Sequence, residues 1–244
     1  MIPPLFYVSD QQKLFAEQLA QKIGTNSSSK IEFLELPHLV LSESGLSFFH
    51  PKARSSKKFQ IDFDSGTTGW RVKRANHEKL IKKALGKSEA PLNILDCTAG
   101  LLQDTLLFLG LGHQVTALEQ SLILFHLLQD GIKRSSDQSI FLKLDLIHTN
   151  ACSYAAMAKG FDVIYFDPMY PPSKKTALSS GQLEYIAKIL EIESINNDPK
   201  QDFEVLQLIP AKKMIVKRPI KAEPFASQIN YQVSGKTTRF DIYI

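Results

Sequence analysis

Short apolar runs recur along the second half of the chain, and helical patterns alternate with them. The runs lie at residues 92–96, 113–119, 142–148, 161–166 and 212–219. Runs this short and continuous are typical of strands buried on both faces of a parallel sheet. Helical periodicity is found at residues 78–85, 105–110, 121–134, 182–192 and, more weakly, 204–209. The alternation predicts an α/β fold with a doubly wound, mainly parallel sheet, which residues 230–244 close as an antiparallel hairpin.

The first part of the chain has a different pattern. Residues 5–8 predict a short strand, and residues 11–23 predict an amphipathic helix that begins after Ser9 or Asp10 and ends at Gly24. Short β-like runs follow at residues 31–36, 38–44, 46–50 and 58–63. Close strands with short turns predict a small α+β domain with antiparallel pairing. We place the junction near Arg74, which gives a domain of residues 1–74 and a second domain of residues 75–244.

Composition narrows the class of protein. The chain has 244 residues, and its hydrophobic content of 43% is enough for a core, which excludes general disorder. No apolar run approaches the ~20 residues that span a bilayer, so we expect no membrane partner. The N-terminus has no basic region before its apolar patch, unlike a signal peptide. Cys97 and Cys152 are too few for a disulfide framework or a zinc site, so we expect reduced thiols in a cytoplasmic protein.

Positive charge is concentrated at the predicted domain junction. Residues 52–87 contain eleven Lys and Arg against three acidic residues, a net charge of +8, although the whole chain carries only +4. Clustered cations bind polyanions such as RNA because phosphates release counterions on binding. A solvated helix face is the alternative interpretation. The charge therefore favours an N-terminal domain that contacts RNA.

The stretch FDVIYFDPMYPP, residues 161–172, has the most distinctive chemistry. Its strand must end at Pro168, which has no N–H for a sheet ladder. Asp167, Pro168, Met169 and Tyr170 should then lie in the crevice beyond the carboxyl end of the strand, where open α/β sheets bind ligands. A carboxylate, an outward carbonyl and an aromatic face suit a planar ring that carries an exocyclic amine. An ordinary strand end with a proline-rich turn is the alternative.

Two other strand ends carry residues suited to a cofactor. The turn from Asp96 to Gly100 opens a helix, and its small residues allow backbone N–H groups to approach a ligand, so Gly100 is a candidate cofactor-binding position. Its single glycine does not make a G-x-G-x-x-G pattern, and an ordinary βα turn is the alternative. Glu119 ends the next strand, where an acid can accept hydrogen bonds from ribose hydroxyls, or can simply be exposed. Asp104 is either a ligand contact or a helix-dipole partner.

These motifs together resemble a known family. The segments are DCTAGLLQD, LEQ, LIHTNA, VIYFDPMYPPSKKTAL, VKRP and RFDIY. Their set and order are similar to those of the bacterial ribosomal RNA small subunit methyltransferase J family, which uses S-adenosylmethionine to make N2-methylguanosine in 16S rRNA. The resemblance extends from about Ile61 to Ile244, and more loosely over the N-terminal domain. It implies a class I, Rossmann-like methyltransferase fold with a mainly parallel seven-stranded sheet.

The resemblance also implies site residues. The family's contacts with S-adenosylmethionine, and with its product S-adenosylhomocysteine, would fall on Gln103, Asp104, Glu119, Gln120, Asn150, Ala151 and Asp167. The catalytic positions would be Asp167, Pro168 and Tyr170. This chain departs from the family in having glutamines at 103 and 120, where arginine is usual, and Asn150-Ala151, where two serines are usual. No metal is needed or suggested.

The implied reaction is methyl transfer to a poorly nucleophilic amine in 16S rRNA or the small ribosomal subunit. Hydrogen bonds from the amine to Asp167 and to the carbonyl of Pro168 would make its lone pair available, and Tyr170 would stack on the base, a contact worth ~1–3 kcal/mol. Lysines and arginine near strand ends are candidates for holding RNA phosphates, with a solvated rim as the alternative. They are Lys174, Lys175, Lys217 and Arg218.

Three other functions remain open from the residues alone. An amino-methyltransferase for adenine N6 or for protein would keep the fold and change the pocket. A non-catalytic RNA-binding protein would keep the basic region but would not need the Asp167-Pro168 pair. A nicotinamide dehydrogenase would need the glycines that the turn after residue 96 lacks.

Overall fold

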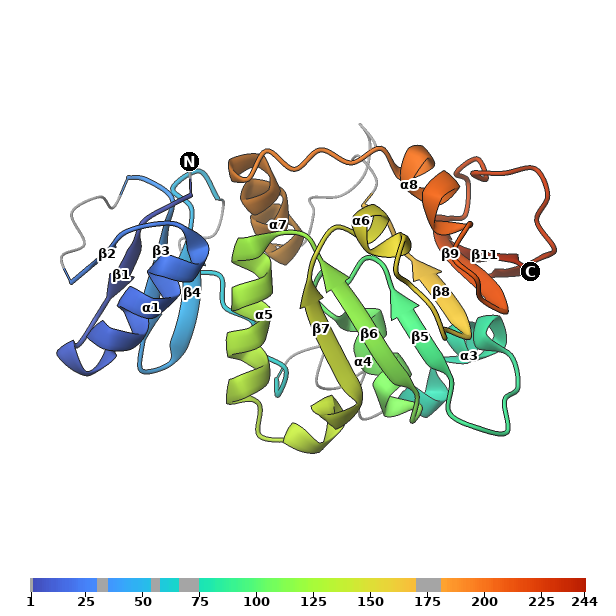
Figure 1. Cartoon of the computed structure of the whole chain (residues 1–244), viewed down its shortest axis with the longest axis horizontal. Helices are drawn as coiled ribbons and strands as arrows, with labels where there is room; N and C mark the ends of the chain where they lie inside the picture. Colours follow the sequence, from blue (N-terminus) through green and yellow to red (C-terminus); the bar gives the residue numbers. More distant parts are fainter. Residues whose placement is uncertain (1, 30–34, 54–57, 66–74, 170–180) are drawn as a thin grey trace. The chain divides into compact units, whose positions relative to one another are not determined.

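The computed structural model describes residues 2–29, 35–53, 58–65, 75–169 and 181–244. These residues form two compact units, and Figure 1 shows their helices and strands. The first unit combines the described residues of Met1–Phe63, Ser121–Ser136 and Pro171–Asn196. The second combines those of Asp64–Gln120, Asp137–Tyr170 and Asn197–Ile244. The expected junction at Arg74 lies outside the described residues, and the division into residues 1–74 and 75–244 stays a prediction.

The second unit is built on a seven-stranded sheet with the order β10-β11-β9-β8-β5-β6-β7. Its strands are β5 (Asn93–Asp96), β6 (Gln114–Glu119), β7 (Leu144–His148), β8 (Val163–Phe166), β9 (Lys213–Pro219), β10 (Tyr231–Ser234) and β11 (Thr238–Tyr243). The strands from β5 to β9 pair in parallel, and β11 pairs antiparallel with β9 and β10. The predicted mainly parallel sheet with a closing hairpin is therefore confirmed.

The helices of the second unit differ from the predicted ranges mainly at their ends. They are η2 (Ala75–His77), α3 (Lys79–Leu85), α4 (Gln103–Gly110), η3 (Gln138–Lys143), α6 (Ala151–Ala155) and α8 (Pro199–Leu206). Helix α8 begins well before the predicted residue 204. The side chain of Asp198 accepts the N–H groups of Lys200 and Gln201, and Pro199 suits the first helical position. The sequence analysis missed α6, because five residues are too few to show a helical period.

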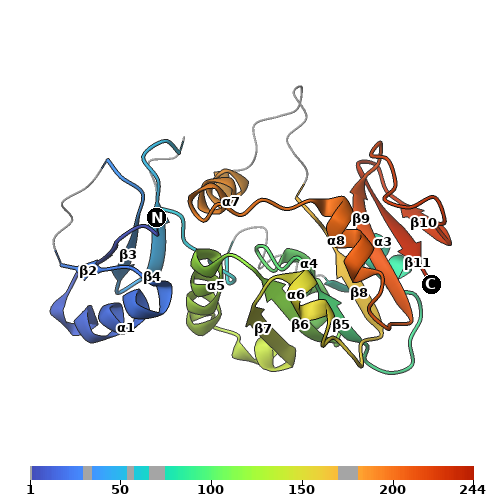
Figure 2. The same ribbon diagram turned by 45° about the horizontal axis from the view of Figure 1, so that its top comes forward.

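Alternate side chains of β8 are buried on opposite faces of the sheet. Ile164 and Phe166 belong to the core cluster that contains Phe203 of α8. Tyr165 meets Phe108 of α4 edge to face, with 4.9 Å between ring centroids. Figures 1 and 2 show α4 on one side of the sheet and α6 and α8 on the other. Burial on both faces explains why this strand reads as a continuous apolar run.

The order of the strands reverses between β5 and β8, which makes their carboxyl ends the topological switch point of the sheet. The chain passes from β5 to β6 and β7, then returns to the other side of β5 with β8 and β9. Connections leave these two neighbouring strands in opposite directions, and open α/β sheets bind ligands where this happens. The residues directly after β5 and β8 are therefore expected to contact a ligand.

The first unit contains a four-stranded sheet with the order β2-β1-β3-β4. Its strands are β1 (Leu5–Tyr7), β2 (Ser27–Ser28), β3 (His38–Ser42) and β4 (Gly45–Phe49). The predicted antiparallel pairing is correct only for β3 with β4, because β1 pairs in parallel with both β2 and β3. Side-chain alternation has the same period in both kinds of pairing, so the sequence could not separate them.

Two of the β-like runs predicted for the first unit do not correspond to strands in the described part of the chain. The run at residues 58–63 is not a strand, because among the described residues it forms only an isolated bridge between Phe59 and Phe48. Most of the run at residues 31–36 lies outside the described part of the chain.

Helices from distant parts of the sequence complete the first unit. They are η1 (Asp10–Gln12), α1 (Lys13–Ile23), α5 (Leu122–Arg134) and α7 (Gly181–Ile192). The Ser121 side chain caps α5 by accepting the N–H of Leu124. Glu193, which follows α7, accepts the Ser121 hydroxyl and the N–H of Ile123. The carboxylate thus adds a charged acceptor to the positive end of the α5 dipole.

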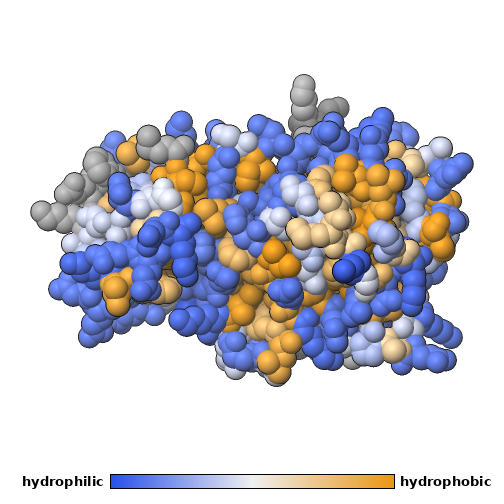
Figure 3. Space-filling model, in the orientation of Figure 1, coloured by the Kyte–Doolittle hydropathy of each residue, from blue (hydrophilic) through white to orange (hydrophobic). Residues whose placement is uncertain are grey.

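Hydrophilic residues cover much of the face shown in Figure 3, with separate hydrophobic areas between them. Large apolar side chains that are exposed in the second unit include Leu142, Met157 and Leu208. Exposed apolar residues of this kind are normal for folded proteins. Among the helices that the structure describes, none combines the length and apolar character needed to cross a bilayer.

Candidate functional site

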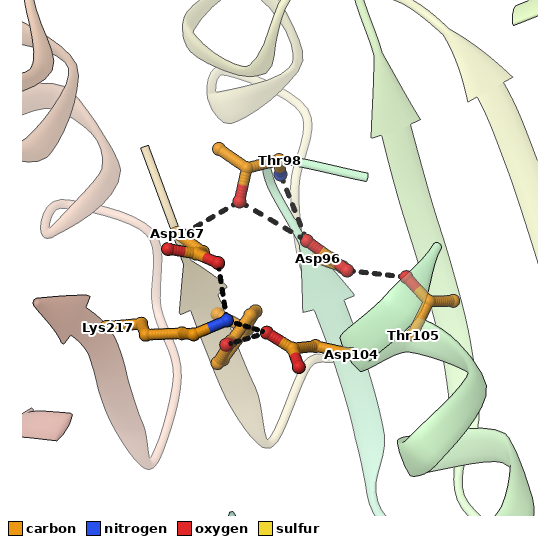
Figure 4. A network of polar contacts seen from close by, with 7 residues as sticks. Asp96, Thr98, Asp104, Thr105, Asp167 and Lys217 are labelled. Carbon is orange, nitrogen blue, oxygen red and sulfur yellow. Dashed lines mark hydrogen bonds and ion pairs between the residues drawn. The ribbon is translucent and has the colours of Figure 1, made fainter. Parts of the chain in front are cut away.

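Polar and charged side chains meet at the crevice between the carboxyl ends of β5 and β8. Figure 4 shows them as one connected network that draws on β5, the turn after it, α4, β8 and β9. All of these elements belong to the second unit.

Asp96 is the buried anchor of the network, with only 2% of its surface exposed. Its carboxylate accepts the N–H of Thr98 at 3.0 Å and the hydroxyl of Thr105 at 2.5 Å. Burial raises the pKa of Asp96 to about 6, and these two hydrogen bonds limit the rise. Asp96 therefore fixes the turn after β5 against the first turn of α4.

The turn after β5 brings the chain into α4 through two left-handed residues. Gly100 has a φ of 51° and Leu102, directly before α4, has a φ of 57°. Leu102 is fully buried, and packing holds it in a conformation that side chains other than glycine rarely adopt. Such a turn leaves N–H groups of the helix start accessible to a ligand. The position of Gly100 is compatible with its expected role, which stays a prediction.

Asp167 lies where the sequence predicted it, directly after β8. Its backbone N–H donates to Oγ1 of Thr98 at 2.8 Å, which joins the end of β8 to the turn after β5. Oδ2 of its carboxylate pairs with Nζ of Lys217 at 2.8 Å. Burial raises the pKa of Asp167 to about 6, Lys217 opposes that rise, and Asp104 adds to it.

Lys217 of β9 joins Asp167 to Asp104. Its ammonium lies 2.6 Å from Oδ2 of Asp104, and the same oxygen accepts the hydroxyl of Tyr165 at 2.6 Å. Burial alone would lower the pKa of Lys217, but the two carboxylates raise it above its ordinary value. The pKa of Tyr165 is raised by burial first and then by Asp104, so its hydroxyl remains a donor. Asp104 is thus a member of the network and not only a dipole partner of α4.

Directly after Asp167, the structure describes Pro168 and Met169. Pro168 is buried, and the Met169 side chain is 49% exposed. Tyr170, Lys174 and Lys175 lie outside the described residues, so the stacking role of Tyr170 stays a prediction.

The other predicted cofactor positions lie at the carboxyl ends of β6 and β7. Glu119 ends β6 and is 6% exposed. The amide of Asn150 donates to Oε1 of Gln120 at 3.0 Å, and the backbone carbonyl of Gln120 lies 3.2 Å from Nε2 of His148. Asn150 also caps α6, which begins at Ala151, by accepting two backbone N–H groups. These residues and the exposed Gln103 at the start of α4 line the same edge of the sheet, because parallel strands end together.

Sequence reasoning missed the supporting members of the network. Thr98, Thr105 and Tyr165 have no distinctive pattern of their own in the sequence. Lys217 was interpreted as a phosphate-binding residue on the rim, but its ammonium lies between two carboxylates. Arg218, interpreted in the same way, is buried and stacks over the ring of Phe225. The available signal was the strand pattern of β9, which puts residue 217 on a central strand of the sheet.

Comparisons with known proteins agree with this geometry. The SAM_MT family model, which describes SAM-dependent methyltransferases, matches residues 19–244. A protein named ribosomal RNA small subunit methyltransferase J from Thioalkalivibrio sulfidiphilus is 30% identical over 249 residues, covering 98% of this chain and 96% of the relative. One of the same name from Coxiella burnetii is 32% identical over 246 residues, covering 97% and 92%.

A solved structure is similar over nearly the whole chain. It is a SAM-dependent methyltransferase from Neisseria gonorrhoeae, with a TM-score of 0.71 and 25% identity, covering 99% of this chain and 95% of that one. The fold, the family model and the curated relatives point to one conclusion. The chain belongs to the ribosomal RNA small subunit methyltransferase J family of S-adenosylmethionine-dependent methyltransferases with an α/β, Rossmann-like fold.

Proposed function

We propose that this protein transfers a methyl group from S-adenosylmethionine to the exocyclic N2 of a guanine in 16S ribosomal RNA. The observation that carries the proposal is the carboxylate of Asp167 at the crevice, with one oxygen held by Lys217. Among the described residues, none donates a hydrogen bond to its other oxygen. An acceptor placed in this way, next to Pro168, suits an amine that has two N–H groups to donate.

The residues at the edge of the sheet fit S-adenosylmethionine chemically. Glu119 ends β6 and can accept hydrogen bonds from ribose hydroxyls. Asp104 has an oxygen to which no described residue donates, and a carboxylate oxygen suits an ammonium group. The remaining proposed cofactor contacts are Gly100, Gln103, Gln120, Asn150, Ala151 and Asp167. When bound, the cofactor supplies an activated methyl group on a sulfonium.

The protein's part in the reaction is to place and polarise the amine. The lone pair of guanine N2 is delocalised into the ring, so the amine is a weak nucleophile. Hydrogen bonds to Asp167 and to the carbonyl of Pro168 would favour a more pyramidal nitrogen with an available lone pair. Methyl transfer would leave positive charge on the amine nitrogen, and Asp167 would stabilise that charge and accept the proton that the amine loses. In-line placement supplies much of the remaining rate.

Several parts of the proposal are supported by the sequence and by the family. Tyr170 would stack on the flipped base. The basic region at residues 52–87 and the N-terminal domain would contact RNA phosphates. The substrate would be 16S rRNA, free or within the small ribosomal subunit, and the protein would act in the cytoplasm.

The test is a comparison of modified nucleosides in 16S rRNA from cells with and without the gene. We expect one N2-methylguanosine to disappear when the gene is removed and to return when it is restored on a plasmid. A full set of N2-methylguanosines in cells that lack the gene, or loss of a methyladenosine instead, would contradict the proposal.

A further inference from the structure

The ammonium of Lys217 joins two carboxylates from separate elements of the fold. Nζ lies 2.6 Å from Oδ2 of Asp104 on α4 and 2.8 Å from Oδ2 of Asp167 after β8. The side chain of Asp104 is 11% exposed and that of Asp167 is 31% exposed, so both pairs are partly shielded from bulk water, the pair with Asp104 more than the pair with Asp167. Figure 4 shows the lysine reaching from β9 between the two acids.

The backbone of Lys217 is anchored in the sheet, one residue beyond the last β8 partner of β9. Strand β9 pairs with β8 and with β11, and residue 217 lies opposite Phe240. Its neighbours Val216 and Arg218 are buried. A side chain that starts from a central strand has fewer positions to search than one on a loop, so it can orient its partners with little loss of entropy.

The hydrogen bonds use Oδ2 of both acids and leave Oδ1 of each acid without a donor among the described residues. Oδ2 of Asp104 receives both Lys217 and the hydroxyl of Tyr165, and Oδ2 of Asp167 receives Lys217. No described residue donates to Oδ1 of either acid. One cation therefore fixes the rotation of both carboxyl groups and leaves one acceptor on each for other groups.

We propose that Lys217 is a positioning residue for methyl transfer, which orients the carboxylates of Asp104 and Asp167 and keeps Asp167 ionised to receive the substrate amine. The inference rests on the proposed function, because it assigns the two acids to cofactor and amine. It replaces the interpretation of Lys217 as a phosphate-binding residue.

The charges around Asp167 explain why a cation is needed to keep its carboxyl group ionised. The ionisable groups that face it are Asp96 from β5, Asp104 from α4, Tyr165 from β8 and Lys217 from β9. Of these, only Lys217 lowers the pKa of Asp167, while burial and Asp104 raise it to about 6. Without the lysine the pKa of Asp167 would rise further, so less of the carboxyl group would be ionised near neutral pH.

The experiment compares three purified variants with the parent protein. Lys217→Met removes the charge, Lys217→Arg keeps it, and Lys212→Met is the matched control. Lys212 lies just before β9 and pairs with Asp162 at 2.8 Å, at the amino end of the sheet. Methyl transfer to small subunits from cells lacking the gene is measured over about pH 5 to 9. Calorimetry measures the affinity for S-adenosylhomocysteine.

We expect Lys217→Met to lower turnover near neutral pH by ~100-fold, since misplaced reacting groups cost this much. The acid limb of its pH profile should move upward, and part of the activity should return at higher pH. Lys217→Arg should keep the acid limb of the parent, and Lys212→Met should match the parent throughout. If Lys217→Met does not fold, Lys217→Gln gives the same comparison.

Two results would overturn the inference. An acid limb that stays at the parental pH in the uncharged variant would show that Lys217 does not control the ionisation of Asp167. Tighter binding of S-adenosylhomocysteine by Lys217→Met would show that the ammonium obstructs the site instead of organising it.

The lysine can also be tested without activity. Carbon-detected NMR of the Asp167 carboxyl group should report a higher pKa in Lys217→Met than in the parent. If the parent protein methylates no ribosomal RNA, the proposed function fails, and this titration still decides whether Lys217 holds Asp167 ionised.

Discussion

The two ends of the candidate site are held together by different forces. At the ends of β8 and β9, Lys217 pairs with Asp104 and Asp167 at distances below 3 Å, in partly buried surroundings. At the ends of β6 and β7, the exposed Asn150 shares a neutral amide hydrogen bond with Gln120. One end is organised by ion pairs, and the other combines the buried Glu119 with exposed hydrogen bonds that water can replace.

The difference matches what each end has to do. A group that stabilises charge in a reaction must be oriented beforehand, because reorientation during the reaction costs energy. Recognition of a cofactor by many separate hydrogen bonds tolerates the loss of one of them. The resemblance predicts four departures from the family pattern, at Gln103, Gln120, Asn150 and Ala151, and none of these side chains carries a charge.

The largest effect should follow a change at Asp167. We expect Asp167→Asn to lower kcat by ~10²–10³, the usual loss for one preorganised contact. The amide is nearly isosteric, but it lacks the charge and has only one acceptor oxygen. Turnover on unmodified small subunits measures the effect, with Asp162→Asn, at the amino end of the same strand, as the control. Parental turnover in Asp167→Asn would make this residue a mere strand terminator.

The next effect concerns stability at Asp96. Because burial raises its pKa from 3.8 to about 6, the folded protein binds this proton more tightly than the unfolded chain does. The free energy of unfolding should therefore decrease as pH rises through this interval, by at most ~3 kcal/mol. In Asp96→Asn this contribution should vanish, since the amide can accept from Thr98 and donate to Thr105.

Urea unfolding at a series of pH values measures this difference. The exposed Asp145 on β7 gives the control, Asp145→Asn, whose pH dependence should follow the parent. If the free energy of unfolding of Asp96→Asn changes with pH as it does in the parent, the buried carboxyl group does not titrate in this interval.

A smaller effect is expected at the cofactor end. Glu119→Ala should weaken the binding of S-adenosylhomocysteine by ~1–3 kcal/mol, because ribose hydroxyls lose a charged acceptor. Isothermal calorimetry gives the affinity directly, and circular dichroism shows whether the fold is kept. Unchanged affinity would remove Glu119 from the cofactor site.

The smallest effect should come from Gln120. Its side-chain oxygen accepts one hydrogen bond from Asn150 at an exposed position. We expect Gln120→Ala to change the same calorimetric affinity by about 1 kcal/mol or less. A loss equal to that of Glu119→Ala would erase the proposed difference between the two ends.

The sequence predicted the parts of the fold and site that depend on local pattern. Strand ends can be read from apolar runs, so Asp167 and Glu119 were correctly placed at the edge of the sheet. The Lys217–Asp104 contact joins residues 113 positions apart, and no local pattern reports such a pairing. The parallel pairing of β1 was missed because strand periodicity is the same in both directions.

One measurement tests the central claim, that this protein methylates the exocyclic amine of a guanine with the help of Asp167. Purified protein is incubated with labelled S-adenosylmethionine and 16S rRNA, free or in small subunits, from cells that lack the gene, and the RNA is digested to nucleosides. We predict that the label is found in N2-methylguanosine and that Asp167→Asn abolishes most of it. Label in N6-methyladenosine, or label in N2-methylguanosine that does not depend on Asp167, would contradict the account.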